Sequence, residues 1–113
     1  MCVSELQGLQ SRLQEIRELD AEVLGISTDT TPKNQNLADS AMIEFPLLSD
    51  TELAAIDAFG VRHVGASMEG TDIARPAVFI VGRDGQIAWR GLTDNWRIRV
   101  RAEMVLEQLR ALP

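Results

Sequence analysis

The sequence is short of the residues on which metal and disulfide chemistry depend. It contains one cysteine, Cys2, and one histidine, His63, in 113 residues. A single thiol can form neither a disulfide within the chain nor a cysteine-rich zinc site, and His63 has no partner at ligand spacing. We therefore expect no metal and no cofactor, and we interpret His63 as a loop residue. Cys2 is either inert or reactive.

Long apolar runs and positive charge are also scarce. The longest apolar run spans only residues 76–81, whereas a membrane span needs about 20 residues. The first residues carry no basic or apolar stretch of a secretory signal. Eleven Lys and Arg oppose 17 Asp and Glu, which gives a net charge of −6 and argues against nucleic acid as a partner. We expect a cytoplasmic protein without membrane or nucleic-acid partners.

The residues that are present suit a folded domain. Hydrophobic residues make up 45% and charged residues 25%, as in average globular proteins, and the length predicts one domain over residues 1–113. Helical spacing of apolar residues predicts helices at 4–19 and 102–112. Thr31 is typical of an N-cap and Pro32 of the first helical position, which predicts a further helix that ends near Ala41. Residues 21–27 form a short apolar run that predicts a buried strand.

The second half of the chain carries turn signals. Ser49 and Glu52 fit a capping box before a short helix that ends at Gly60, and residues 61–74 lack a period and predict a loop. Residues 77–81 and 86–90 flank an Asp-Gly turn and predict a β-hairpin. Helices that alternate with strands in this way indicate an α/β fold in which helices cover a sheet.

Cys2 lies directly before the first predicted helix. Backbone N–H groups at a helix start are unpaired, and the helix dipole favours an anion there, so a thiolate at this place is stabilised and its pKa falls. The alternative is an incidental residue in a frayed N-terminus. The position by itself leaves both interpretations open.

Arg75 and Pro76 open the strand predicted at residues 77–81. Proline has no N–H to donate, so it belongs at the first residue of a strand, and an X-Pro bond at such a junction can be cis. Arg75 would present its guanidinium at the end of the sheet, where it could donate to a thiolate. The alternative is a surface side chain, one of ten arginines in the chain.

Several segments, in this order and spacing, resemble one known family. They are Cys2-Val3-Ser4-Glu5-Leu6, Gly25-Ile26-Ser27-Thr28-Asp29, Phe45-Pro46-Leu47-Leu48-Ser49-Asp50, Ala58-Phe59-Gly60-Val61 and Arg75-Pro76-Ala77-Val78-Phe79. The family is the peroxiredoxins, also called the alkyl hydroperoxide reductase and thiol-specific antioxidant (AhpC/TSA, redoxin) family. The resemblance implies a thioredoxin-like fold, with a mixed sheet, a C-terminal β-hairpin and flanking helices.

The resemblance also implies a thiol peroxidase. Cys2 matches the cysteine whose thiolate attacks a peroxide and becomes a sulfenic acid, Arg75 matches the arginine that polarises the peroxide, and Glu5 would orient Arg75. Pro76 matches the cis-proline of the thioredoxin fold. Because the chain holds no second cysteine, the reductant would be an external thiol of the thioredoxin or glutathione type.

The chain departs from the family pattern before Cys2. The family carries a first strand and a Pro-x-x-x-Thr-x-x-Cys loop there, whereas only Met1 precedes Cys2. We therefore expect a fold that lacks the usual first strand, as in the C-terminal part of a longer protein whose upstream part could hold a second cysteine. Two alternatives remain: an inactive thioredoxin-fold module that forms a homodimer or binds a partner, and a thiol-disulfide oxidoreductase, which Pro76 suggests.

Overall fold

The computed structural model describes residues 3–92 and 100–112 of the chain, which falls into two units. The central unit is Leu24–Arg75, and the terminal unit combines Cys2–Val23 with Pro76–Pro113. Each unit contains buried apolar side chains. They are Ile43, Phe45, Ile56 and Val61 in the central unit, and Leu6, Leu13, Ile16, Ile80, Val105 and Leu106 in the terminal unit.

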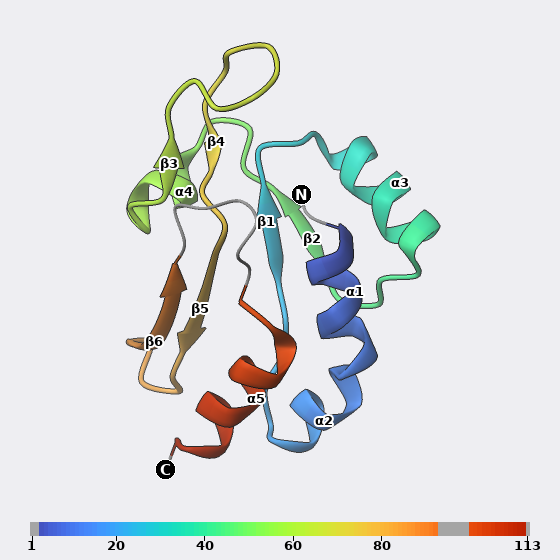
Figure 1. Ribbon diagram of the computed structural model, residues 1–113, viewed down its shortest axis with the longest axis vertical. Helices are drawn as coiled ribbons and strands as arrows, with labels where there is room; N and C mark the ends of the chain where they lie inside the picture. The colour runs from blue at the N-terminus through green and yellow to red at the C-terminus, as the bar shows by residue number, and fades with distance from the viewer. Residues whose placement is uncertain (1–2, 93–99, 113) are drawn as a thin grey trace. The chain divides into compact units, whose positions relative to one another are not determined.

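The central unit begins with two parallel strands and the helix that joins them (Figure 1). Strand β1 (Gly25–Ser27) pairs with β2 (Leu47–Ser49), and α3 (Thr31–Ala41) forms the crossover that a parallel pair needs. The predicted end of α3 at Ala41 is confirmed, but the predicted N-cap is wrong by one residue: Thr30 is the N-cap, and Thr31 is the first residue of the helix. Strand β1 is shorter than the apolar run at residues 21–27 because only its last three residues pair.

Asn34 joins this helix to both strands. It is 1% exposed, it accepts a hydrogen bond from Ser27 Oγ at 3.1 Å, and it donates one to Ser49 Oγ at 3.2 Å. Ser27 and Ser49 are register partners at the ends of β1 and β2. Because a buried amide is tolerated only when it is hydrogen-bonded, Asn34 couples the position of α3 to the strand register.

The predicted capping box after β2 is wrong. Helix α4 (Ala54–Ala58) starts later, and its N-cap, Leu53, has φ 60° and makes no side-chain cap bond. Ser49 is held in β2 and bonds to Asn34, so its hydroxyl belongs to the strand end. Asp50, rather than Ser49, pairs with a backbone N–H near the start of α4, since its carboxylate accepts the Ile56 N–H at 2.7 Å.

The end of α4 follows the prediction. Gly60 has φ 70°, its N–H donates to Asp57 O at 3.0 Å, and the Val61 N–H donates to Ile56 O at 3.0 Å. These two bonds form a Schellman motif, and the buried pair Ile56 and Val61 supplies the hydrophobic contact that accompanies it. The left-handed glycine thus turns the chain into the next strand.

The loop predicted at residues 61–74 contains two short strands. Strand β3 (Arg62–His63) pairs antiparallel with β4 (Ile73–Ala74). His63 therefore lies in a strand, and its interpretation as a loop residue is wrong. Two-residue strands are too short to show the alternation by which a strand is predicted.

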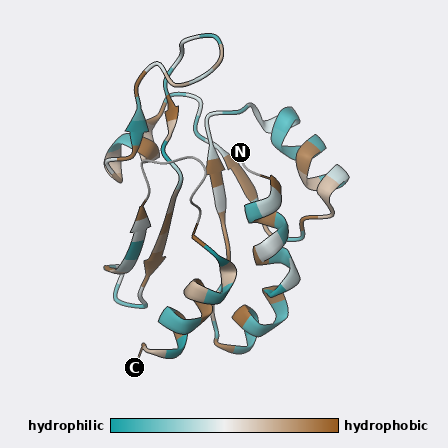
Figure 2. Ribbon diagram, in the orientation of Figure 1, coloured by the Kyte–Doolittle hydropathy of each residue, from teal (hydrophilic) through white to brown (hydrophobic). Residues whose placement is uncertain are grey.

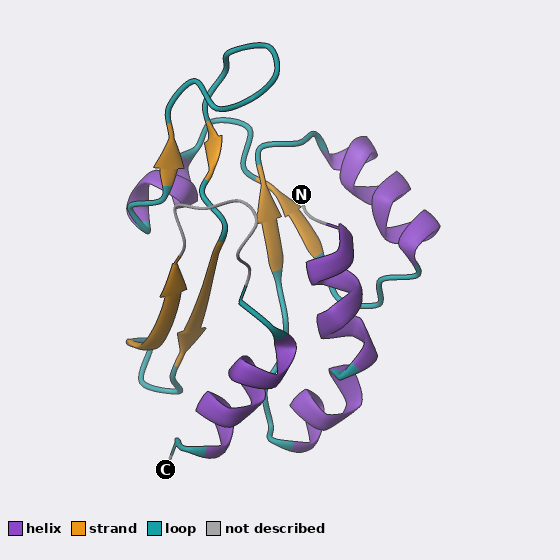
Figure 3. Cartoon of the chain, viewed as in Figure 1, coloured by secondary structure: helices purple, strands orange, loops and turns teal. Residues whose placement is uncertain are grey.

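The described residues of the terminal unit form three helices and a hairpin (Figure 3). They are α1 (Val3–Ser11), α2 (Leu13–Glu18), β5 (Ala77–Val81), β6 (Ile87–Leu92) and α5 (Ala102–Arg110). The helix predicted at residues 4–19 is thus two helices. Ser11 Oγ donates to Gly8 O at 2.8 Å, while the Arg12 N–H donates to Leu9 O at 3.2 Å. A serine hydroxyl that takes a backbone carbonyl in this way bends a helix.

The hairpin is confirmed. Strands β5 and β6 pair antiparallel, with Ala77 opposite Leu92, and Gly85 in the turn has φ 81°. Pro76 directly precedes β5, as expected for a residue without a donor. The described residues contain no cis peptide bond, so the expected cis-proline is wrong here. The trans isomer of an X-Pro bond is lower in free energy by about 0.5–1 kcal/mol.

The helices and strands differ in their content of hydrophobic residues. Figure 2 shows β2 and β5 as largely hydrophobic, whereas hydrophilic residues dominate α3. Among the residues that the structure describes, no helix is long and apolar enough to cross a membrane.

We predict that Asn34→Ala lowers the free energy of unfolding by about 1–3 kcal/mol, because it removes both hydrogen bonds of the buried amide and leaves the buried Ser27 hydroxyl without its acceptor. The control is Gln35→Ala on the same helix, which removes only an exposed bond of 3.0 Å to Asp39 and should cost less than about 0.5 kcal/mol. Urea unfolding of both variants measures the difference. Equal losses would contradict the role given to Asn34.

Candidate functional site

The helix start required beside Cys2 is present. Helix α1 begins at Val3, directly after Cys2, which itself lies outside the described residues. The helix has nine residues and carries Glu5, which is partly buried, in its first turn. The dipole of a helix favours an anion at its first turn. An activated Cys2 thiolate therefore stays a prediction, and the start of α1 at the next residue is consistent with it.

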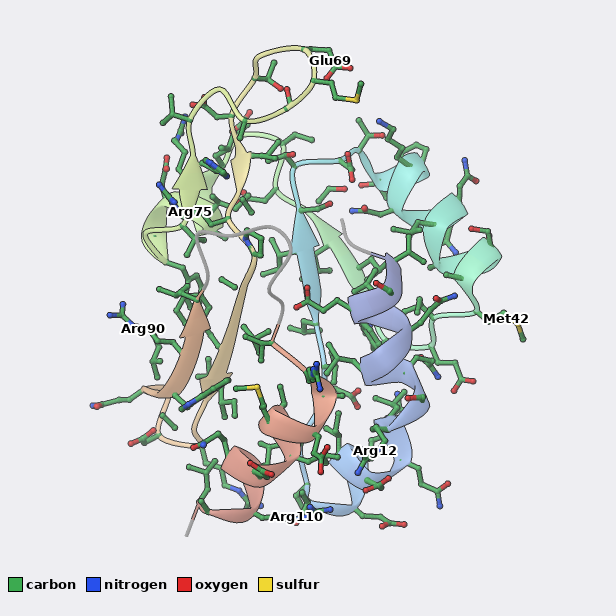
Figure 4. All side chains as sticks on the ribbon, viewed as in Figure 1. Arg12, Met42, Glu69, Arg75, Arg90 and Arg110 are labelled. Atoms are coloured by element: carbon green, nitrogen blue, oxygen red, sulfur yellow. The ribbon has the colours of Figure 1, made fainter. Side chains whose placement is uncertain are left out.

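Arg75 is positioned through its backbone. It directly follows β4, and its N–H donates to Val61 O at 2.7 Å. This bond continues the β3–β4 pairing, in which Arg62 lies opposite Ala74. Val61 is only 6% exposed and ends the Schellman motif of α4, so the anchor itself is buried. Figure 4 labels the Arg75 side chain, which is partly buried.

The three predicted site residues are not brought together within one unit. Glu5 belongs to the terminal unit and Arg75 to the central unit, and Cys2 lies outside the described residues. The constellation of Cys2, Arg75 and Glu5 therefore remains a prediction. What the structure supplies is the local placement of Glu5 and Arg75.

Sequence reasoning missed an ion cluster centred on Arg62, which lies opposite Ala74 in the β3–β4 pair. Arg62 binds Asp57 through two bonds, Nε to Oδ1 at 2.7 Å and Nη2 to Oδ2 at 2.6 Å, and its Nη1 binds Asp72 Oδ2 at 2.6 Å. Asp72 also accepts the Gly65 N–H at 2.8 Å. The cluster ties α4, β3 and the base of the loop at residues 64–72 together. Its members are too far apart in sequence to form a motif, although Asp57 and Arg62 flank the Gly60 turn.

The charges of this cluster reinforce each other. Hydrogen bonds from Arg62 lower the pKa of Asp57, and the carboxylates of Asp57 and Asp72 raise the pKa of Arg62. The pKa of Asp72 is lowered first by the Gly65 N–H and then by Arg62. All three groups therefore stay charged at neutral pH. Their ion pairs hold β3 in place beside β4, the strand that Arg75 directly follows.

A groove of about 290 Å³ lies between α3 and residues 43–47, in the central unit. Within residues 3–92 and 100–112, no three His, Cys, Asp or Glu side chains are grouped to hold a metal ion.

Comparisons with known proteins place the chain among thioredoxin-fold peroxiredoxins. AhpC of Enterococcus faecalis matches with a TM-score of 0.84 and 29% identity, over 97% of this chain and 65% of that one. Reduced Prx3 of Vibrio vulnificus in complex with H2O2 matches with a TM-score of 0.83 and 16% identity, over 93% of this chain and 67% of that one. The predicted thioredoxin-like α/β fold is thus confirmed.

The sequence comparisons agree. Peroxiredoxin Bcp of Escherichia coli K12 is 29% identical over 110 residues, which cover 96% of this chain and 69% of that protein. A sequence model of the AhpC/TSA family matches residues 1–90. The chain belongs to the AhpC/TSA family. It spans about two thirds of the length of these relatives, 65% of the Enterococcus protein and 69% of the Escherichia one.

We predict that Arg62→Gln raises the pKa of Asp57 more than the pKa of Asp72. The pKa of Asp57 should return close to its ordinary value, because Arg62 is its main cause, whereas that of Asp72 should stay low because the Gly65 N–H remains. Carbon-detected NMR titration of both carboxyls measures this. Equal recovery of the two pKa values would contradict the assignment.

The same shifts predict how folding stability depends on pH. Both carboxyls have a lower pKa in the folded chain than the ordinary value of about 3.9. Their stabilisation is therefore complete above that value and is lost as the pH falls through the folded pKa. Between pH 5 and pH 2, urea unfolding should show a shallower loss for Arg62→Gln than for the natural sequence. Parallel curves would contradict this.

Proposed function

We propose that the chain carries out thiol-dependent peroxide reduction, with Cys2 as the nucleophile. The observation that carries the proposal is the family match over residues 1–90, which includes Cys2 immediately before the first turn of α1. A thiol at a helix N-terminus is the kind whose pKa falls far enough to react at neutral pH. The H2O2 bound to the Vibrio protein supports a hydroperoxide as the substrate class.

The reaction breaks one bond and forms one. The Cys2 thiolate attacks one peroxide oxygen, the O–O bond breaks, and the other oxygen leaves with the electron pair and takes a proton. The products are a sulfenic acid on Cys2 and water or an alcohol. In this proposal the Arg75 guanidinium donates to the thiolate and to the peroxide, and Glu5 orients Arg75.

The sulfenic acid must then be reduced. The chain holds one cysteine, so we assign this step to an external thiol of the thioredoxin or glutathione type. That thiol condenses with the sulfenic acid to a mixed disulfide and water, and a second thiol releases Cys2. The homodimer and the cytoplasmic location remain predictions from the sequence.

We predict that Cys2→Ser abolishes peroxide consumption and that Arg75→Gln slows it on the order of a hundredfold, as loss of one positioned donor does. The matched control is Arg83→Gln, which removes an equal charge from an exposed side chain that lies 3.4 Å from Asp20. Stopped-flow kinetics with H2O2 under excess thiol give the rates. Equal effects of Arg75→Gln and Arg83→Gln would contradict the role of Arg75.

Two further measurements separate the alternatives. Alkylation kinetics that give a Cys2 pKa near the unperturbed value of about 8.5 would exclude an activated thiolate. Insulin reduction without peroxide consumption would assign a thiol-disulfide oxidoreductase. If neither reaction occurs and sedimentation shows a dimer, the inactive interaction module is the better description.

A further inference from the structure

We propose that Met68 is a second, reversible site of peroxide oxidation, separate from Cys2. The inference takes from the proposed function only its substrate class, a hydroperoxide. It concerns a thioether at the tip of the loop between β3 and β4, and it needs neither Arg75 nor an activated thiolate.

Exposure singles out Met68 among the described methionines. Met68 is 102% exposed, compared with 79% for Met42 and 45% for Met104. Figure 4 shows Met42 beside the end of α3, and it shows Glu69, the neighbour of Met68, at the loop tip. Oxidation of a thioether needs contact between sulfur and peroxide but no deprotonation, so among surface methionines access to solvent decides the order of reaction.

The tip holds Met68 in this exposed position through bonds that do not involve its sulfur. Ser67 Oγ and Thr71 Oγ1 share a hydrogen bond of 2.6 Å, and Ser67 Oγ accepts the Thr71 N–H at 2.8 Å. The Ser67 N–H donates to Thr71 O at 3.1 Å, and the Gly70 N–H donates to Ser67 O at 3.0 Å. Met68 therefore sits in a closed turn that its own side chain does not stabilise.

The base of the loop at residues 64–72 is also held by bonds that do not involve Met68. The Gly65 N–H and the Arg62 guanidinium both bind Asp72, so the ion cluster closes the loop below its tip. A polar sulfoxide at Met68 would remove no packed contact and break none of these bonds. Met104 differs, because its side chain in α5 is only 45% exposed, so that added polarity is more costly there.

The chemistry balances with the peroxide alone. The thioether sulfur attacks one peroxide oxygen, the O–O bond breaks, and the product is a sulfoxide together with water or an alcohol. Thiol-dependent methionine sulfoxide reductases reverse this oxidation, and an exposed tip is accessible to them. Met68 and Val64, which is 74% exposed, are the large apolar residues of this loop, so oxidation makes the tip markedly more polar.

The test exposes the full chain with Cys2→Ser to H2O2 and follows each methionine by peptide mapping and mass spectrometry. Met68 should become the sulfoxide at least about threefold faster than Met104, with Met42 between them. Met68→Leu should remove the fastest phase, whereas Met104→Leu should leave it. A methionine sulfoxide reductase added under native conditions should restore Met68.

The urea midpoint of the protein oxidised only at Met68 should equal that of the untreated protein. Oxidation of Met68 no faster than of Met104, or a lowered midpoint, would overturn the proposal. Because Cys2 is absent from the test protein, these outcomes do not depend on whether Cys2 is the peroxidatic residue. Failure of the Cys2 proposal would show only in the consumption of peroxide by the natural sequence.

Discussion

The buried amide of Asn34 is the constraint on which the central unit depends. Strands β1 and β2 have three residues each, so few ladder bonds hold their register. Asn34 adds bonds to Ser27 and Ser49, which lie opposite each other at the strand ends. A slip of one residue would withdraw one hydroxyl and leave a buried polar group unpaired, at a cost of about 1–3 kcal/mol. The polar network thus specifies a register that the short strands do not.

The register of β2 is transmitted along the chain by a series of local bonds. Asp50 follows β2 and accepts the Ile56 N–H, the Gly60 turn closes α4, and the Val61 carbonyl accepts the Arg75 N–H. The first bonds fix the backbone a few residues further along the chain, and the last reaches from Val61 across the loop to Arg75. The Arg75 backbone is therefore positioned by hydrogen bonds within the central unit. The ion pairs of Arg62 with Asp57 and Asp72 add side-chain support to β3.

The parts of the fold that could be predicted from sequence are those with local signals. Helix α3, the β5–β6 hairpin and α5 follow from proline, Asp-Gly and apolar periodicity, and they are present as expected. The capping box failed because Ser49 could serve either a helix start or the Asn34 network, and the first helix broke because Ser11 competes for a backbone carbonyl. Such choices between partners depend on tertiary contacts, which a local pattern does not contain.

The candidate site shows the same division. Position in the sequence drew attention to Cys2 and Arg75 but left an inert thiol and a surface arginine as alternatives, and the family resemblance gave both residues, together with Glu5, their predicted roles. The Arg62 cluster escaped detection because it joins residues five and ten positions away from Arg62 across two turns. Sequence reasoning therefore finds residues that a family shares, and it misses the ion pairs that hold their backbone in place.

The two proposed oxidation sites differ in what the protein must provide. A cysteine reacts as its thiolate, so in the proposed mechanism Cys2 needs an environment that lowers its pKa, which the helix start and the Arg75 guanidinium would provide together. A thioether has no proton to lose, so Met68 needs only solvent access, which its turn guarantees. A substitution that raises the pKa of Cys2 would therefore make the thiol unreactive at neutral pH but would leave Met68 open to oxidation. Such a variant would lose the proposed peroxide reduction by Cys2, whereas Met68 would still be oxidised to the sulfoxide.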